Sequence, residues 1–267
     1  MPIPKRIIQT GKRRELPLKQ SAFAANVRLL NPEFDWCFFD DADVNRFISS
    51  EFPEHRHMFD EFAFPIQRYD FFRYLAVHRM GGFYLDLDVL LAIGLSSLCA
   101  HECVFPFEGL TFSRLLRERG MDWEIGNFAF GAAAGHPFLE AVIANCVRSQ
   151  TDPTWVRKMM RGVPTLSKSE YQVLYTTGPG VLSRTLAENP ILAPDVTVLF
   201  PDDVCDVQSW NQFGNFGVHL MEGTWRPNVS RVRRRLAQRY EAWSLKKVIR
   251  TSRRLGKTRQ VGLVQPV

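Results

Sequence analysis

Two aspartates, Asp86 and Asp88, follow an apolar stretch, Phe83-Tyr84-Leu85, with a single leucine between them. Side chains two residues apart in an extended chain project to the same side, so the two carboxylates are expected to face a common point. Two carboxylates held that close raise each other's pKa unless a cation lies between them, and hard oxygen ligands favour Mg²⁺ or Mn²⁺. The pair by itself fits a divalent metal site that bridges to a phosphorylated substrate, or a solvated turn at the end of a strand.

The elements expected around this pair favour the metal site. A helix is predicted to begin at Pro65, because proline suits a first helical turn, and to stop at Gly81-Gly82. Phe83–Leu85 then forms a strand, and both acids lie at its carboxyl end. Ligands of open α/β sheets collect at that edge.

The rest of the chain alternates between apolar strands and helices, which predicts an α/β domain with a largely parallel sheet. The other expected strands are Ile3–Thr10, Phe34–Phe39, Asn127–Ala133, Val196–Phe200 and Gly217–Leu220. The other expected helices are Leu18–Leu30, a short one from about Asp43, one from His136-Pro137 to about Ser149, one near Pro153 and one from Gly178-Pro179-Gly180 to Glu188.

Asp70 and Arg73 lie three residues apart in the helix that begins at Pro65, so they share one face of it. Such a pair is usually a surface ion pair. Here the helix leads through two glycines straight to Asp86 and Asp88, so its end lies beside any ligand bound there.

At this point the sequence resembles glycosyltransferase family 32, the Asp-x-Asp sugar-binding enzymes, and more distantly the glucosylating toxins of clostridia. The resemblance covers most of residues 3–225 in the right order. The matching segments are Ile3 to Gln9, Asn31 to Asp41, Arg68 to Asp88, Asn127 to Phe130, Gly135 to Phe138, Thr177 to Gly180 and His219 to Trp225.

This resemblance implies a GT-A fold, a Rossmann-like and mostly parallel central sheet flanked by helices. It also implies a nucleotide-sugar donor, either a UDP- or a GDP-sugar, and Mn²⁺ or Mg²⁺ as cofactor. The reaction implied is transfer of a hexose to a glycan or lipid-linked acceptor with retention of anomeric configuration.

Site residues follow from the resemblance by motif position. The implied catalytic residues, which hold the donor sugar, ribose and metal, are Asp70, Arg73, Asp86, Asp88 and Asn127. The implied substrate-binding residues are Gln9, Thr10, Tyr84, Gly178, Thr224 and Trp225. The implied metal ligands are Asp86, Asp88 and His219, with Asp88 the firmest. Relatives often carry an aromatic residue where this chain has Thr10-Gly11, so the identity of the base stays open.

Departure of a nucleoside diphosphate needs charge stabilisation, which a metal and Arg73 would supply, and needs no separate acid. Retention requires either a carboxylate nucleophile or a same-face attack in which the leaving phosphate accepts the proton of the acceptor. Glu124 is the nearby acid in the sequence, three residues before Asn127. We favour the same-face mechanism.

A different enzyme class fits the same acids. Asp86-Leu87-Asp88-Val89 also matches the nucleophile motif of haloacid-dehalogenase-like phosphatases, with Asp202, Asp203 and Asp206 as a later acidic motif. That motif normally follows the first strand of its domain, whereas two strands and three helices are expected before Asp86. The phosphatase is therefore the alternative rather than the preferred function.

With 267 residues, 45% of them hydrophobic, the chain can bury a sizeable core. The expected organisation is one domain over residues 1–225 and a basic, helical tail over residues 226–267. Five cysteines at irregular spacings indicate free thiols, and the N-terminus lacks the apolar run of a signal peptide, so a cytoplasmic location is expected. Cys99 and Cys103, with His101 between them, lack a second ligand pair at zinc-site spacing.

The tail concentrates positive charge. From Arg226 onward there are thirteen Lys and Arg residues and one acid, Glu241, whereas the net charge of the whole chain is +6. Apolar residues recur there at helical spacing: Val229, Val232, Leu236, Tyr240 and Trp243. Such a helix would lie peripherally on an anionic membrane at its inner face, or pack its apolar stripe on the domain. Nucleic acid is disfavoured as a partner, because no nucleic-acid-binding motif accompanies the charge.

Overall fold

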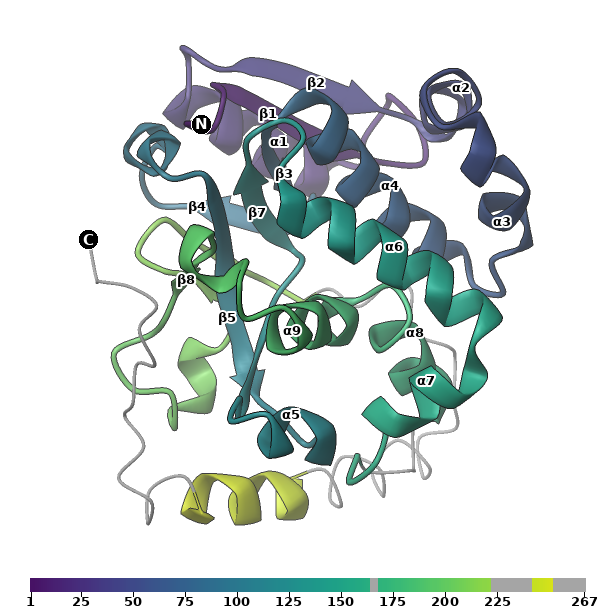
Figure 1. The fold of residues 1–267 in the computed structure, drawn as a ribbon. Helices are drawn as coiled ribbons and strands as arrows, with labels where there is room; N and C mark the ends of the chain where they lie inside the picture. The colour runs from purple at the N-terminus through teal and green to yellow at the C-terminus, as the bar shows by residue number, and fades with distance from the viewer. Residues whose placement is uncertain (164–167, 222–241, 252–267) are drawn as a thin grey trace.

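A computed structural model describes residues 1–163, 168–221 and 242–251 of the chain. Seven of its strands form one sheet in the order β2-β1-β3-β7-β5-β6, with β8 paired to β5 (Figure 1). Their bounds are β1 (Arg6–Thr10), β2 (Asp35–Phe39), β3 (Gly82–Leu85), β5 (Cys103–Leu110), β6 (Trp123–Ile125), β7 (Ala129–Ala132) and β8 (Thr197–Leu199).

Five of the seven strands run in one direction. β1 is parallel to β2 and to β3, and β7 runs antiparallel to both β3 and β5, so β5 points the same way as β3. β8 is parallel to β5, and β6 is antiparallel to it. The predicted α/β class with a mostly parallel central sheet is therefore confirmed.

Alternate residues of the strands enter two cores on opposite faces of the sheet. In β3, Tyr84 packs in the core shared with the helices α4 (Pro65–Met80), α6 (Pro137–Thr151) and α9 (Pro179–Glu188). Phe83 packs in the core shared with α1 (Leu18–Leu30). Ile8 and Ile7 divide in the same way in β1. In Figure 1, α4, α6 and α9 cross the face of the sheet turned toward the viewer, and α1 lies behind it.

Several helices have the bounds that local signals predict. The helices are α1 (Leu18–Leu30), α2 (Asp41–Glu51), α3 (Arg56–Glu61), α4 (Pro65–Met80), α5 (Arg114–Glu118), α6 (Pro137–Thr151), α7 (Pro153–Met159), α8 (Lys168–Leu174) and α9 (Pro179–Glu188). Proline occupies the first turn of α4, and Gly81 follows its end with a positive φ of 64°. These two residues fix where α4 begins and ends.

A small antiparallel sheet in the order β4-β10-β9 lies beside the core that contains α1. Its strands are β4 (Val89–Leu91), β9 (Gln212–Phe213) and β10 (Gly217–His219). Val89 and Leu91 are buried there with Phe213 and Phe216. Because β4 begins directly after Asp88, this sheet connects the two acids to residues near position 219.

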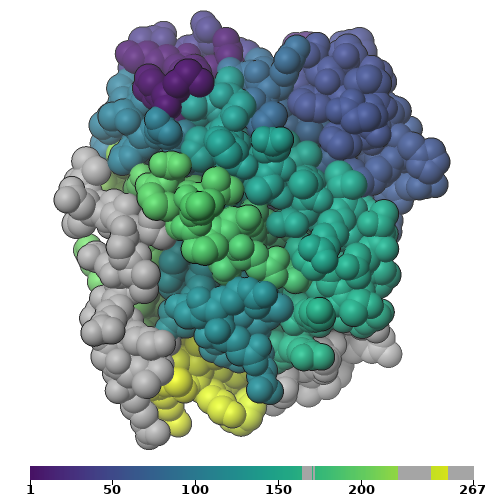
Figure 2. Space-filling view, viewed as in Figure 1, coloured from purple at the N-terminus to yellow at the C-terminus, as the bar shows by residue number. Residues whose placement is uncertain are grey.

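Residues 242–251 form a helix, which is yellow at the edge of the molecule in Figure 2. Val248 and Ile249 of this helix pack against the main core, whereas Trp243 is 61% exposed. The remaining positions of the predicted apolar stripe, Val229, Val232, Leu236 and Tyr240, lie outside the described residues. Within the part of the chain that the structure describes, no helix has the length and apolar character needed to cross a bilayer.

Candidate functional site

Asp86 and Asp88 lie in a tight turn between β3 and β4. The strand ends at Leu85, and the backbone N–H of Val89 donates to the carbonyl of Asp86 at 3.1 Å. The backbone N–H of Asp86 donates to the carbonyl of Phe128 at 2.8 Å, which ties the turn to the start of β7. The spacing of the two acids predicts an extended chain through both of them. The turn brings the carboxylates together instead, at the predicted carboxyl end of the strand.

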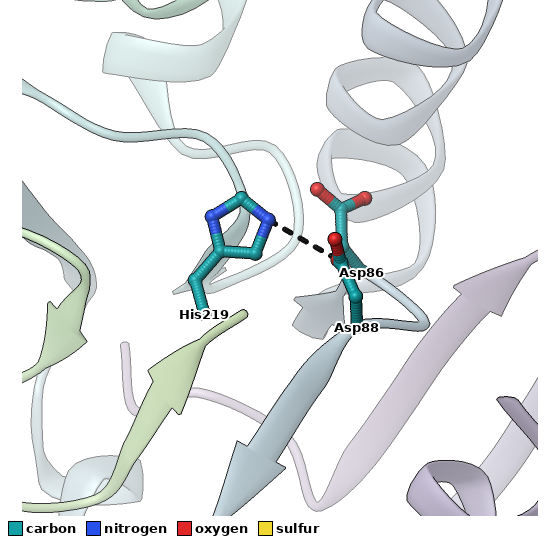
Figure 3. Close-up of side chains that lie close together, drawn as sticks. All are labelled: Asp86, Asp88 and His219. Carbon is teal, nitrogen blue, oxygen red and sulfur yellow. Dashed lines mark ion pairs between the residues drawn. The ribbon is translucent and has the colours of Figure 1, made fainter. Parts of the chain in front are cut away.

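His219 joins the two acids because β10 pairs with β4. His219 lies opposite Val89 in register, and the N–H of Leu220 donates to the carbonyl of Asp88 at 3.0 Å. The Nε2 atom of His219 lies 3.1 Å from Oδ1 of Asp88, and the imidazole ring stacks on the ring of Phe128 with centroids 4.6 Å apart. Figure 3 shows the imidazole facing both carboxylates from the end of its strand.

One ligand atom from each of Asp86, Asp88 and His219 lies within 4.8 Å of the others. Two carboxylate oxygens and an imidazole nitrogen are a donor set that suits Mn²⁺ or Mg²⁺. The three residues predicted as metal ligands are therefore brought together.

Arg73 connects this cluster to α4. Its Nη1 donates to Oδ2 of Asp86 at 3.2 Å and to the carbonyl of Asn127 at 2.8 Å, while Nη2 lies 3.2 Å from Oδ1 of Asp70. The guanidinium also lies over the ring of Tyr84, 4.6 Å from its centroid. Arg73 is 3% exposed, so its charge acts on both carboxylates with little screening.

Asp70 is the other acid that Arg73 contacts, and it is 4% exposed. It accepts hydrogen bonds from Nδ2 of Asn127 at 3.0 Å and from the hydroxyl of Thr177 at 3.1 Å. The hydroxyl of Tyr74 donates to the carbonyl of Thr177 at 2.7 Å and accepts from the same amide of Asn127 at 3.0 Å. The predicted residues Asp70, Arg73 and Asn127 thus form one buried network.

Thr177 and Tyr74 belong to this network, although the sequence motifs predict no role for them. Their sequence positions could have indicated a role, since Thr177 directly precedes the predicted Gly178 and Tyr74 directly follows Arg73 in α4. Gly178 is the residue before α9, where an added Cβ would lie 2.9 Å from the backbone of Leu174. The substrate-binding role predicted for Gly178 stays a prediction.

Tyr84 and Thr10 continue the network toward β1. The hydroxyl of Tyr84 donates to Oδ1 of Asp86 at 3.0 Å and lies 2.9 Å from the hydroxyl of Thr10. Gln9 projects to the opposite face of the sheet, where its Oε1 accepts a hydrogen bond from Trp36 at 2.9 Å. Its Nε2 has no hydrogen-bond partner among the described residues. Thr224 and Trp225, also predicted to bind substrate, lie outside the described residues.

Burial and charge set the protonation of the cluster. Burial raises the pKa of Asp86 although the charges of Arg73 and His219 lower it, and burial likewise raises the pKa of Asp70 against the effect of Arg73. Burial lowers the pKa of His219, but the hydrogen bond to Asp88 and the nearby carboxylates outweigh it, so that pKa lies above 6.5. The carboxylates of Asp70, Asp86 and Asp88 outnumber the guanidinium of Arg73, which favours a bound cation.

Glu124 lies on β6, and its described partners are outside this cluster. It accepts hydrogen bonds from the hydroxyls of Thr111 at 2.5 Å and Tyr175 at 3.2 Å, and burial raises its pKa. The acids of the alternative phosphatase motif are also separate from the cluster: Asp203 accepts from the N–H of Cys205, and Asp206 from that of Gln208. Both hydrogen bonds join residues two apart in the chain and close local turns.

Comparison with known proteins bears on this site. Residues 18–105 match the family described as "Glycosyltransferase sugar-binding region containing DXD motif", a stretch that includes Asp70, Arg73, Asp86 and Asp88. The chain is 30% identical over 181 residues to inositol phosphoceramide mannosyltransferase 3 of Schizosaccharomyces pombe, covering 68% of this chain and 44% of that protein. It is 30% identical over 137 residues to mannosyl phosphorylinositol ceramide synthase SUR1 of Saccharomyces cerevisiae, covering 51% of this chain and 33% of that protein.

Among solved structures, the UDP-bound glycosyltransferase domain of the YGT toxin aligns with a TM-score of 0.49 and 9% identity, over 74% of this chain and 79% of that one. The predicted resemblance to glycosyltransferase family 32 is confirmed, and the GT-A class of this α/β fold stays what that resemblance implies. The chain spans less than half the length of the two yeast relatives.

Proposed function

We propose that this chain is a glycosyltransferase that moves a hexose from a UDP- or GDP-sugar to a glycan or lipid-linked acceptor, using Mn²⁺ or Mg²⁺. The observation that carries the proposal is the convergence of Asp86, Asp88 and His219 beside the buried Arg73–Asp70–Asn127 network. The names of both yeast relatives specify mannosyl transfer, which makes mannose the favoured sugar and GDP-mannose the first donor to test.

Asp86, Asp88 and His219 would hold the metal, which would neutralise the negative charge that develops on the diphosphate leaving group. Arg73 adds a fixed positive charge next to Asp86, in a buried position where such a charge stabilises a developing anion strongly. Tyr84 and Thr10 hold the Asp86 carboxylate in one orientation through their linked hydroxyls. Asp70, whose oxygens accept hydrogen bonds from Asn127 and Thr177, would hold Arg73 and Asn127 in place beside the donor sugar.

We further propose that transfer retains the anomeric configuration by same-face attack. A carboxylate nucleophile would need a free oxygen at the reacting carbon. Both described partners of Glu124, Thr111 and Tyr175, donate to its Oε1, and burial raises the pKa of this carboxyl, which disfavours the ionised form that a nucleophile needs. Direct determination of the anomeric configuration of the product by NMR tests retention.

The function is tested by titrating the protein with a panel of UDP- and GDP-sugars in the calorimeter, with and without Mn²⁺, and by following sugar release. Mn²⁺-dependent binding and release of one sugar is the expected result. Asp88→Asn should abolish both, whereas Asp202→Asn, which changes an exposed acid of the phosphatase motif, should preserve both. Hydrolysis of simple phosphoesters without sugar release would overturn the transferase in favour of the phosphatase.

A lipid-linked acceptor would also explain the concentration of positive charge in the tail. We propose that the tail holds the enzyme at an anionic membrane surface, where such an acceptor resides. The charge of the sequence after Arg226 supports this proposal, and the name of the first relative specifies a phosphoceramide.

A further inference from the structure

The strand pair formed by β4 and β10 has an apolar outer face. Val89 and Leu91 of β4 point into the core behind the main sheet. Leu90 and Val218 lie opposite each other in register and project from the other face, where Leu90 is exposed and Val218 is half-buried. An antiparallel sheet with one solvated face commonly carries polar side chains there, as Gln212 does on β9. The β4–β10 pair departs from this pattern.

Helix α1 lies along the free edge of β4 and also presents apolar side chains to the outside. The side chain of Asn26 donates to the carbonyl of Leu91 at 3.1 Å and accepts from the N–H of the same residue at 2.9 Å. Leu18 is 88% exposed and Leu29 is 78% exposed. At spacings of three and four residues, one exposed apolar stripe of the helix comprises Leu18, Ala22, Ala25 and Leu29.

The outer faces of α1 and of β4 turn the same way, because both elements cover the same side of the main sheet. Val27 of α1 is buried in one core with Val89 of β4 and Phe83 of β3. In Figure 1, α1 and β4 both lie behind the main sheet. The large apolar side chains exposed on and next to these two elements form what we call the α1–β4 surface: Leu18, Leu29, Leu90 and Ile93. Such a group on neighbouring elements is typical of an interaction site.

The charge of the segments that form this surface indicates the kind of partner. Residues 16–30 and 89–100 contain Lys19 and Arg28 and no Asp or Glu, although residues 1–225 as a whole carry more acids than bases. Apolar side chains accompanied by positive charge are suited to an anionic lipid surface. A second copy of the chain would bring the same bases opposite each other, and like charges across an interface repel.

The α1–β4 surface ends at the candidate metal site. Leu90 follows Asp88 by two residues, and the N–H of Leu220 donates to the carbonyl of Asp88 at 3.0 Å. Leu220 and Met221 directly follow His219, and both are exposed. A bilayer in contact with the α1–β4 surface would therefore have the candidate metal site close to its headgroups.

We propose that the α1–β4 surface docks the protein on an anionic phospholipid bilayer, with Leu18, Leu29 and Leu90 in contact with the lipid. Docking in this way holds the candidate metal site next to a lipid-linked acceptor, and this consequence rests on the proposed glycosyltransferase function. The surface acts in addition to the basic tail, because it belongs to the body of the protein and binds mainly through apolar contact.

The first test measures binding of the full chain to phosphatidylcholine vesicles that contain phosphatidylserine. At about 0.5 M salt the Debye length is about 4 Å, so attraction by the tail is screened and apolar contact remains. We expect Leu18→Gln/Leu29→Gln to lower the vesicle affinity roughly tenfold or more, because less apolar area leaves water on binding. Leu90→Thr should lower it in the same direction.

Ile191 provides the matched control for this test. It is 86% exposed, and it follows α9, which packs in the core on the opposite side of the main sheet. Ile191→Gln should leave the vesicle affinity within about twofold of wild type. Mn²⁺-dependent donor hydrolysis in solution should be the same in all these variants, because none of the substituted residues is a predicted site residue.

The second test locates the contact directly. Leu29→Trp and Ile191→Trp each add one tryptophan, and brominated phosphatidylcholine quenches the fluorescence of tryptophans that reach the lipid. The fluorescence added at position 29 should be quenched on vesicles, whereas the fluorescence added at position 191 should not be.

Equal affinity of wild type and Leu18→Gln/Leu29→Gln at high salt would overturn the proposal, and so would equal quenching at positions 29 and 191. A wild-type dimer in light scattering that the double variant abolishes, with vesicle affinity unchanged, would assign the surface to a second copy instead. Failure of the proposed function is visible separately, as the absence of Mn²⁺-dependent donor hydrolysis in the wild-type protein, and it leaves the vesicle measurements intact.

Discussion

Arg73 lies between the buried carboxylate of Asp70 and the part-buried carboxylate of Asp86, and its removal would leave both without this cation. Breaking a buried ion pair from one side commonly costs about 3–5 kcal/mol, because the remaining charge is desolvated and uncompensated. We therefore expect Arg73→Met to lower the free energy of unfolding by that amount in urea titrations.

The matched control for Arg73→Met is on the same helix. Arg79 pairs with Glu51 at 2.7 Å, but its side chain is 61% exposed, so Arg79→Met should cost less than about 1 kcal/mol. Adding Asp70→Asn to Arg73→Met should cost less than the sum of the two single changes. Equal losses of unfolding free energy in Arg73→Met and Arg79→Met would contradict a larger contribution of the buried ion pairs to stability.

The protonation of Asp86 and His219 predicts how metal binding depends on pH. Both pKa values lie above their ordinary values, and both groups must lose their protons to act as ligands. Mn²⁺ affinity should therefore fall as pH drops below the raised pKa of His219, and fall further as Asp86 takes up its proton.

Calorimetry from about pH 5.5 to 8.5, in buffers of different protonation enthalpy, measures both the affinity and the protons released. His219→Gln should remove the upper part of the pH dependence and leave the part due to the carboxylates. Affinity that stays constant across this range would contradict the proposed ligand set.

At the scale of the elements, the pairing of β10 with β4 decides whether His219 reaches Asp88. Gly217 opens β10, and an added Cβ there would lie 2.6 Å from the carbonyl oxygen of Leu90 in β4. Gly217→Ala should push the two strands apart, at a cost of about 1–3 kcal/mol in unfolding free energy. Because His219 is two residues away, we also expect roughly a tenfold or greater loss of Mn²⁺ affinity.

Gly120→Ala is the control for this prediction. Gly120 has a φ of 80° and nothing within 4 Å of an added Cβ, so alanine there strains the backbone without a steric clash. The position is also far from β10 in the sequence. It should destabilise the fold modestly and leave Mn²⁺ affinity intact. Normal affinity in Gly217→Ala would mean that the strand register does not control His219.

The sequence predicts elements that depend on local residues and does not predict those that depend on pairing with distant strands. The bounds of α4 follow from Pro65 and Gly81, which act within the helix itself. Strand β5 does not follow from the sequence, because the residues of Cys103–Leu110 show no apolar–polar alternation and include Pro106 and Gly109, which are uncommon inside strands. Strand β4 is three residues long and depends on β10 for its pairing.

The candidate site shows the same division. The sequence motifs predicted Asp70, Arg73, Asp86, Asp88, Asn127 and His219 as a group, and all six meet in the structure. The contact of Tyr84 with Thr10 depends on the parallel register of Ile8 with Tyr84, which the sequence does not reveal without a strand order. That Gln9 and Thr10 project to opposite faces of the sheet can be predicted from the sequence, because the side chains of neighbouring strand residues alternate.

At the scale of the whole molecule, charge is divided between an acidic body and a basic tail. Val248 and Ile249 pack against the main core, so deleting everything after Arg226 would remove core contacts together with charge. Substitution of the basic side chains is the cleaner experiment. Arg233, Arg234 and Arg235 lie outside the described residues and form the densest run of positive charge in the sequence.

Each basic residue near an anionic surface contributes about 1 kcal/mol of attraction. Arg233→Gln/Arg234→Gln/Arg235→Gln should therefore weaken binding to phosphatidylserine-containing vesicles by roughly 100-fold, whereas binding to pure phosphatidylcholine stays weak throughout. Lys12→Gln/Arg13→Gln/Lys158→Gln removes the same charge from exposed positions of the body and should have a smaller effect. Sugar release from the donor should be unaffected in both variants, because the role proposed for the tail concerns the location of the enzyme and not its chemistry. Vesicle co-sedimentation at increasing salt measures the binding, and equal retention of wild type and the tail variant would refute a role of the tail at membranes.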